Sequence, residues 1–163
     1  ASLDALDNVV PYIDGEEEKI VAETRKFLGK WDGSAFQPAD IPMSVTATRV
    51  SVRDGHTESV TLSLKGKPTI DEVKTCLRAF RGRPQELELP TAPEHPIVVM
   101  DQPDRPQPVL DRDLERGMAS VVGRVREDPV LGVAFVVLGH NTIRGAAGAS
   151  VLNAELLVAE RCI

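Results

Sequence analysis

The feature that most constrains the fold is the run VLGVAFVVLG at 130–139, where consecutive side chains are apolar. A strand with one solvated face alternates apolar and polar residues, so a strand that is apolar on both faces must have protein on each side. The run ASVVGRVR at 119–126 precedes it, separated only by the turn-like EDP at 127–129. These segments predict two strands of one sheet, with 130–139 in a central position.

Three other segments carry a helical rather than a strand period. Apolar side chains recur at helical spacing in 16–31, 69–80 and 141–161. Thr69 and Glu72 form a capping box at the start of the second of these. The proline-rich stretch 84–108 predicts loops around one short strand at 97–100. We therefore predict an α+β fold with a mixed, largely antiparallel sheet and helices on one face.

The last of these segments is more apolar than a sheet of this size requires. Residues 141–161 are apolar over more than one stripe, and a helix of about 20 residues is about 30 Å long. The helix should be buried. We infer that part of its surface packs against something outside this chain.

Asp54 and Gly55 give a two-residue turn signal between two strand-like runs, 43–53 and 56–64. In the predicted hairpin Arg53 lies opposite His56, and Arg49 shares their face. A histidine can take and return a proton, and an arginine can bind a carboxylate or phosphate with two hydrogen bonds. The hairpin is therefore a candidate site for an anionic substrate. The simpler interpretation is that these charged residues are solvated at the turn and that Glu58 pairs with Arg53, and from the hairpin alone we favour it by roughly 3 to 1.

Charge and hydropathy exclude several classes of function. The net charge of -6 comes without any basic cluster, which opposes binding to nucleic acid or to an anionic membrane. The apolar runs fall short of the roughly 20 residues that cross a bilayer, so no membrane partner is expected. The chain begins without a basic and apolar leader, which favours the cytoplasm.

Sequence motifs for common cofactors and nucleophiles are missing. There is no P-loop, no G-x-G-x-x-G and no G-x-S-x-G, and three scattered histidines make no metal site. Cys76 and Cys162 cannot form a disulfide framework, and Cys76, on the apolar stripe of its predicted helix, is expected to be a small core residue.

Five stretches together resemble a known enzyme family. They are GEEEKIVAETRKFL, SVTATRVSVRDGHTESV, VVMDQPDRPQP, VGRVRED and HNTIRGAAGAS. Their order and approximate spacing are similar to those of aspartate-semialdehyde dehydrogenases, particularly the archaeal and fungal branch. The likeness covers nearly the whole chain, and it is to the carboxyl-terminal part that follows the nucleotide-binding domain.

The resemblance implies a reaction and a set of site residues. The family reduces aspartyl 4-phosphate to aspartate semialdehyde and phosphate with NADPH, through a cysteine thioester, in lysine, threonine and methionine biosynthesis. By motif, His56 is the acid/base that activates the cysteine, and Arg49 binds the substrate α-carboxylate. Glu16 would receive the substrate ammonium group and Lys19 the phosphate. The register of the glutamate stays open among Glu16, Glu17 and Glu18.

The resemblance also implies a cofactor, a domain division and an assembly. Asn141 and Thr142 would touch the nicotinamide end of NADP, which the absent Rossmann domain mainly binds. Residues 1–140 would be the substrate-binding and dimerisation domain, and 141–163 a C-terminal helix belonging with the nucleotide-binding domain. A homodimer or a dimer of dimers is expected.

The chain departs from the family in one large respect, because it has neither the Rossmann fingerprint nor the S-N-C-type nucleophile segment. These 163 residues should therefore be inactive alone. Two alternatives stay open. One is an acyl-CoA reductase such as malonyl-CoA reductase, which the presence of Glu16 and Lys19 disfavours. The other is a noncatalytic dimerisation module, which the retention of Arg49 and His56 disfavours.

Overall fold

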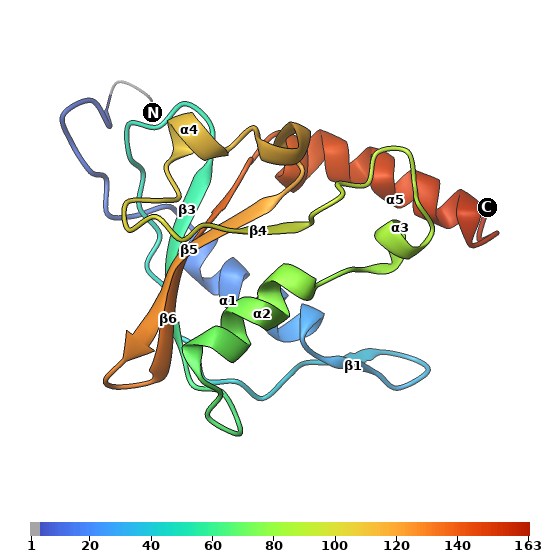
Figure 1. Cartoon of the computed structure of the whole chain (residues 1–163), viewed down its shortest axis with the longest axis horizontal. Coiled ribbons are helices and arrows are strands. Elements are labelled where there is room, and N and C mark those ends of the chain that lie inside the picture. The colour runs from blue at the N-terminus through green and yellow to red at the C-terminus, as the bar shows by residue number, and fades with distance from the viewer. Residues whose placement is uncertain (1–3) are drawn as a thin grey trace. The chain divides into compact units, whose positions relative to one another are not determined.

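The computed structural model describes residues 4–163 and divides the chain into two compact units, Ala1–Val52 and Arg53–Ile163 (Figure 1). The first unit contains α1 (Glu16–Phe27), β1 (Lys30–Trp31) and β2 (Phe36–Gln37). The strands and longer helices of the second are β3 (His56–Leu62), α2 (Ile70–Ala79), β4 (Ile97–Val99), β5 (Ser120–Asp128), β6 (Gly132–Gly139) and α5 (Gly148–Ala159). Its short helical turns are α3 (Arg83–Glu86), α4 (Pro108–Asp111), a 3-10 turn (Leu114–Gly117) and a π turn (Ile143–Ala147).

The second unit is built on a four-stranded sheet in the order β3-β6-β5-β4. β6 pairs antiparallel with β3 and β5, whereas β4 pairs parallel with β5. The predicted mixed, largely antiparallel sheet is therefore confirmed, and so is the interior position of the 130–139 strand. Leu138 of β6 is completely buried, and its neighbour Val121 on β5 is 1% exposed.

The predicted hairpin around Asp54 and Gly55 is wrong. β3 pairs along its whole length with β6, from His56 opposite Gly139 to Leu62 opposite Val133. Residues 43–53 form no strand, so the expected pair of Arg53 with His56 does not exist. The physical reason is that β6 is buried and must have both of its edges hydrogen-bonded. β5 supplies one edge and β3 the other.

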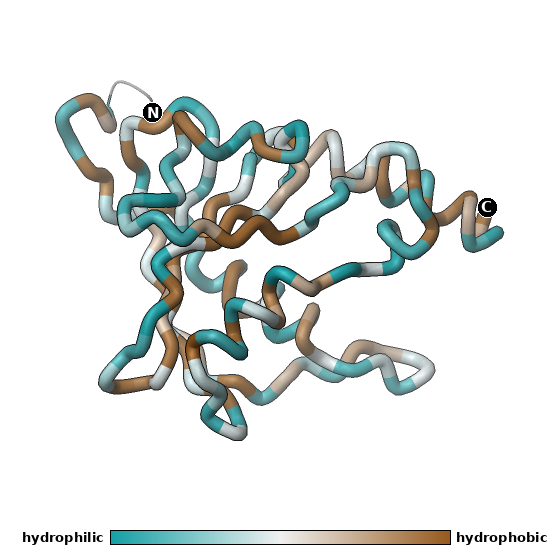
Figure 2. Tube along the Cα trace, viewed as in Figure 1, coloured by the Kyte–Doolittle hydropathy of each residue, from teal (hydrophilic) through white to brown (hydrophobic). Residues whose placement is uncertain are grey.

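One helix, α2, packs on this sheet, as expected for an α+β fold. α2 begins at the predicted capping box, in which the Thr69 hydroxyl accepts from the Glu72 N–H and the Glu72 carboxylate accepts from the Thr69 N–H. α2 contacts β4 and β5, and Figure 2 shows β4 as a continuous apolar segment. Cys76, however, is exposed on α2 rather than in the core.

The last segment is helical but buries only one stripe. Leu152 packs with Leu89 and Met118 in a small core. The helix backbone lies close to Met118 at Gly148, where an added Cβ would be 2.4 Å from the Met118 sulfur. Other apolar side chains of α5 stay open to solvent, with Val151 51% and Val158 62% exposed. These exposed side chains fit the inference that α5 has a second packing partner.

The first unit is held together by side-chain to backbone hydrogen bonds. Arg25 of α1 donates to the Ile41 carbonyl at 3.0 Å, and Glu17 accepts from the Ala47 N–H at 2.8 Å. Asp32 organises the turn between β1 and β2, and the N–H donors of Ala35 and Ser34 with the Gln37 amide lower its pKa. The extended residues 41–50 are thereby tied to α1.

A buried ion pair fixes the loop that leads into α4. The Asp111 side chain is fully buried and accepts hydrogen bonds from the Arg105 guanidinium and from the Gln107 N–H. The Arg105 guanidinium holds the pKa of Asp111 below its ordinary value. A buried carboxylate is stable only when it is paired in this way.

Replacing this carboxylate should destabilise the second unit. We expect Asp111→Asn to lower the free energy of unfolding by about 2 kcal/mol at pH 7, because it leaves Arg105 without its counter-charge. The folded pKa is depressed, so the contribution is complete above the unfolded value of about 3.9 and is lost as pH falls through the folded value. Urea titrations at pH 7 and in strong acid test both statements. The exposed Glu127 of β5 is the control, and equal losses for Glu127→Gln and Asp111→Asn would contradict the role of the pair.

No helix among residues 4–163 is long and apolar enough to cross a membrane.

Candidate functional site

His56 lies where two neighbouring strands end at the same edge of the sheet. It is the first residue of β3 and pairs with Gly139, the last residue of β6. The chain that leaves β6 continues at once into Asn141 and Thr142. The Asn141 side-chain oxygen accepts a hydrogen bond from the Gly55 N–H at 2.9 Å. The sheet register therefore brings three of the predicted site residues, His56, Asn141 and Thr142, to one place.

The peptide group between Asp54 and Gly55 is held from both sides. Asn141 accepts from its N–H, and the Arg112 Nη1 atom donates to its carbonyl, the Asp54 oxygen, at 3.2 Å. Arg112 follows directly after α4, whose last residue is the buried Asp111. Two side chains distant in sequence thus hold both polar atoms of the Asp54–Gly55 peptide, one peptide before the one that enters His56.

Gly55 makes this arrangement possible through its backbone conformation. Its φ of 117° lies in the region that glycine tolerates and other residues avoid. An added Cβ would also meet Leu138 at 3.0 Å and Pro108 at 3.4 Å. The turn before His56 is therefore packed directly on Leu138 near the end of β6 and on Pro108 at the start of α4.

His140 supports Asn141 from the neighbouring position. Its ring is only 7% exposed, and its Nδ1 atom accepts from the N–H groups of Thr142 and Ile143 at 3.3 and 3.4 Å. Since backbone N–H groups only donate, the ring proton must be on Nε2, which lies 3.7 Å from the Asp113 carboxylate. His140 therefore caps the turn that carries Asn141 and Thr142, satisfying N–H groups that a helix start leaves unpaired.

The predicted substrate contacts lie in the first unit. Arg49 forms a two-bond antiparallel bridge with Val10, with N–O distances of 3.1 and 2.9 Å. Lys19 lies 3.8 Å from the Glu16 carboxylate on α1, and both side chains are accessible. Glu17 is instead occupied by the Ala47 N–H, two residues before Arg49. The first unit therefore ties the Arg49 segment to the start of α1, and Glu17 has a structural partner that Glu16 does not share.

Sequence reasoning missed two residues that build the site. Arg112 carries no local signal, because its contact with Asp54 spans 58 positions of the chain. His140 did carry one, since it stands between an apolar strand and a helical segment where a capping side chain is needed.

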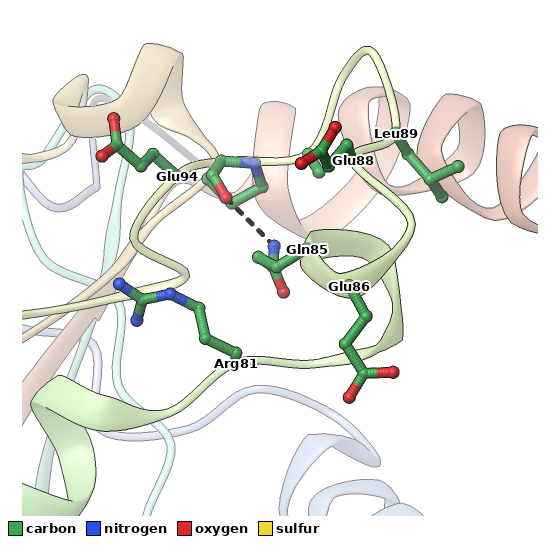
Figure 3. A pocket seen from close by; sticks show the side chains of 8 residues that line it. Arg81, Gln85, Glu86, Glu88, Leu89 and Glu94 are labelled. Carbon is green, nitrogen blue, oxygen red and sulfur yellow. Dashed lines mark hydrogen bonds between the residues drawn. The ribbon is translucent and has the colours of Figure 1, made fainter.

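A pocket of about 450 Å³ lies elsewhere in the second unit (Figure 3). Arg81, Gln85, Glu86 and Glu94 are among its lining residues, and the Gln85 amide donates to the Pro93 carbonyl at 3.0 Å. None of the predicted site residues lines it. Within residues 4–163, no group of three histidine, cysteine or acidic side chains is placed to hold a metal ion.

Comparison with known proteins gives one consistent result. The family model described as "Semialdehyde dehydrogenase, dimerisation domain" matches residues 1–144. The aspartate-semialdehyde dehydrogenase of Methanothermobacter thermautotrophicus is 51% identical over 158 residues, 96% of this chain and 46% of the relative. That of Candida albicans is 46% identical over 170 residues, 100% of this chain and 47% of the relative. The chain thus spans about half the length of these relatives.

Solved structures agree with the sequence relatives. The aspartate semialdehyde dehydrogenase of Candida albicans with NADP superposes with a TM-score of 0.91 at 46% identity, covering 100% of this chain and 48% of that one. The Vibrio cholerae enzyme II complexed with ASA gives a TM-score of 0.72 at 28% identity, over 93% of this chain and 41% of that one. By its sequence and by its fold, the chain belongs to the semialdehyde dehydrogenase family, of which it carries the dimerisation domain.

Proposed function

We propose that the protein carrying this chain is an NADP-dependent aspartate-semialdehyde dehydrogenase of the cytoplasm. It would reduce aspartyl 4-phosphate to aspartate semialdehyde and phosphate in lysine, threonine and methionine biosynthesis. The observation that carries the proposal is the meeting of His56 with the Asn141 segment at one edge of the sheet, in a chain 46% identical to a dehydrogenase solved with NADP. A noncatalytic module would have no need to keep both elements.

The proposed roles follow from the chemistry of each side chain. His56 is exposed at the start of its strand, where its ring can take a proton from a nucleophile and return it to a leaving group. Neither Cys76 nor Cys162 lies at this edge, so the nucleophilic cysteine would come from a segment outside these 163 residues. The chain then supplies the base, and the thiol comes from the nucleotide-binding part.

The substrate contacts and the cofactor contacts are assigned to separate segments. Arg49 would bind the α-carboxylate, Glu16 the ammonium group and Lys19 the phosphate. Asn141 and Thr142 offer a neutral amide and a hydroxyl, the donor and acceptor chemistry that suits the nicotinamide carboxamide. The bound cofactor would supply the hydride, and these residues would orient its reactive end. Residues 141–163 would then belong with the nucleotide-binding domain, and 1–140 with the substrate.

Removing the base should abolish most of the activity. In the protein that carries this chain, His56→Ala should lower kcat for aspartyl 4-phosphate by roughly 100-fold or more. His95→Ala is the matched control, because His95 is an exposed histidine away from the proposed site. Turnover is followed by the change in NADPH absorbance. Near-normal turnover of His56→Ala would show that His56 is not the base. If the unsubstituted protein reduced a CoA thioester and not the acyl phosphate, the proposed substrate would be wrong.

Replacing the guanidinium of Arg49 by an amine should weaken substrate binding. Lysine keeps the charge of Arg49 but cannot form two parallel hydrogen bonds to a carboxylate. Arg49→Lys should therefore raise KM for aspartyl 4-phosphate by about 10-fold and leave KM for NADPH unchanged. The exposed Arg126→Lys is the control. An unchanged substrate KM would mean that Arg49 serves only the backbone bridge with Val10.

We further propose that the chain assembles as a homodimer or a dimer of dimers through its sheet. One face of β3, the outer strand, presents the exposed residues Thr57, Ser59 and Thr61. These small side chains suit close packing of a second sheet. The family match to a dimerisation domain supports this.

Light scattering tests the assembly directly. The chain should scatter with at least twice the monomer mass of 17.7 kDa. Ser59→Arg should reduce the mass to that of the monomer, since it buries a charge in the proposed surface. Thr75→Arg on α2 is the control, because this threonine is exposed on another element. A wild-type monomer at all concentrations, or a dimer that Ser59→Arg leaves intact, would contradict the assignment.

A further inference from the structure

We propose that Arg112 and Asn141 are positioning residues for His56, which they hold through the peptide between Asp54 and Gly55. The inference rests on the proposed function, because the orientation of His56 matters only if His56 is the catalytic base. It assigns Arg112 a role that neither the motifs nor the resemblance assigned to it. It also gives Asn141 a second role, beside the contact with the cofactor.

The first step is that one peptide group is held at both of its polar atoms. The Arg112 guanidinium donates to the Asp54 carbonyl at 3.2 Å, and the Asn141 side-chain oxygen accepts from the Gly55 N–H at 2.9 Å. A peptide group is planar, so fixing both ends fixes the plane. The fixed plane places the Cα atom of Gly55, and only the Gly55–His56 peptide then separates it from the β-ladder that begins at His56.

The second step is that the turn has few other constraints on its direction. Gly55 has a positive φ and lacks the side chain that would restrict its rotation. The β-ladder with β6 begins only at His56. Leu138 and Pro108 limit the turn on one side by contact. The two hydrogen bonds therefore anchor the chain at Gly55, immediately before the ladder begins.

The third step is that both holding side chains are themselves anchored. Arg112 is 18% exposed and follows Asp111, which is completely buried in its ion pair with Arg105. Asn141 lies between the buried His140 and the turn that His140 caps. Both side chains are partly shielded from solvent. Rigid support of this kind is what a base needs, because a misplacement of about 1 Å can cost about 100-fold in rate.

Arg112 gives the cleaner test, because no cofactor role is proposed for it. Arg112→Met keeps the aliphatic stem and removes the donor to Asp54. It should lower kcat by about 10-fold or more, with KM for both substrates changed less than about 2-fold. Arg112→Lys retains one donor and should recover part of the loss. Arg126→Met, at an exposed arginine on β5, should leave kcat unchanged.

A double-mutant cycle separates this inference from the proposed function. If Arg112 acts through His56, Arg112→Met should have no further effect in a His56→Ala background. A full additional loss in that background, or an unchanged kcat for Arg112→Met alone, would overturn the positioning role while leaving His56 as the base. Normal turnover of His56→Ala alone would instead overturn the proposed function, and the positioning role with it.

Hydrogen exchange provides a readout that needs no turnover. In the same protein, Asn141→Leu removes the acceptor of the Gly55 N–H, whereas Asn141→Asp keeps one. The Gly55 amide should lose protection in Asn141→Leu and retain it in Asn141→Asp. Asn153→Leu, at an exposed position of α5, should not alter it. Equal protection in Asn141→Leu and in the unsubstituted protein would show that this peptide is held by other contacts and would overturn the inference.

Discussion

The second unit depends on one constraint, the need of the buried strand β6 for hydrogen-bonding neighbours along both edges. β3 pairs with it from Val133 to Gly139, and β5 pairs with it from Gly132 to Gly139 around a bulge between Gly123 and Arg126, so its backbone groups are hydrogen-bonded mainly within the sheet. Because β3 pairs with β6, it does not pair with residues 43–53, and His56 lies opposite Gly139. The same register places the end of β6, and so the Asn141 segment, beside the start of β3. The hydrogen-bonding requirement of β6 therefore places His56 at the edge of the sheet where β6 ends.

Around that edge, buried polar contacts connect distant parts of the chain. The Arg105–Asp111 pair fixes α4, and the next residue, Arg112, reaches the Asp54 carbonyl. On the other side His140 caps the turn that presents Asn141. Together these contacts hold the backbone before His56 from two sides. An exposed histidine is therefore supported by groups that are largely buried.

The sequence predicted the elements well where the signal was local. The helix after Thr69 begins at its capping box, and the central strand could be identified because consecutive apolar residues require burial on both faces. The Asp54-Gly55 turn misled the prediction, because a turn signal names residues that can reverse the chain and says nothing of which strands then pair. The Cys76 prediction failed similarly, since helical spacing marks a stripe but does not say how far the stripe is covered.

The sequence by itself determined the membership of the chain in its family, the type and order of the longer elements apart from the expected strand at 43–53, and His56, Arg49 and Asn141 as candidates. These depend on motifs and periodicity, which are properties of neighbouring residues. Only the tertiary structure decided that His56 and Asn141 share an edge through β6, that Glu17 is occupied by Ala47, and that Arg112 holds the turn. The reason is that these contacts join residues 30 to 86 positions apart. Packing and strand register, which no local pattern encodes, bring them together.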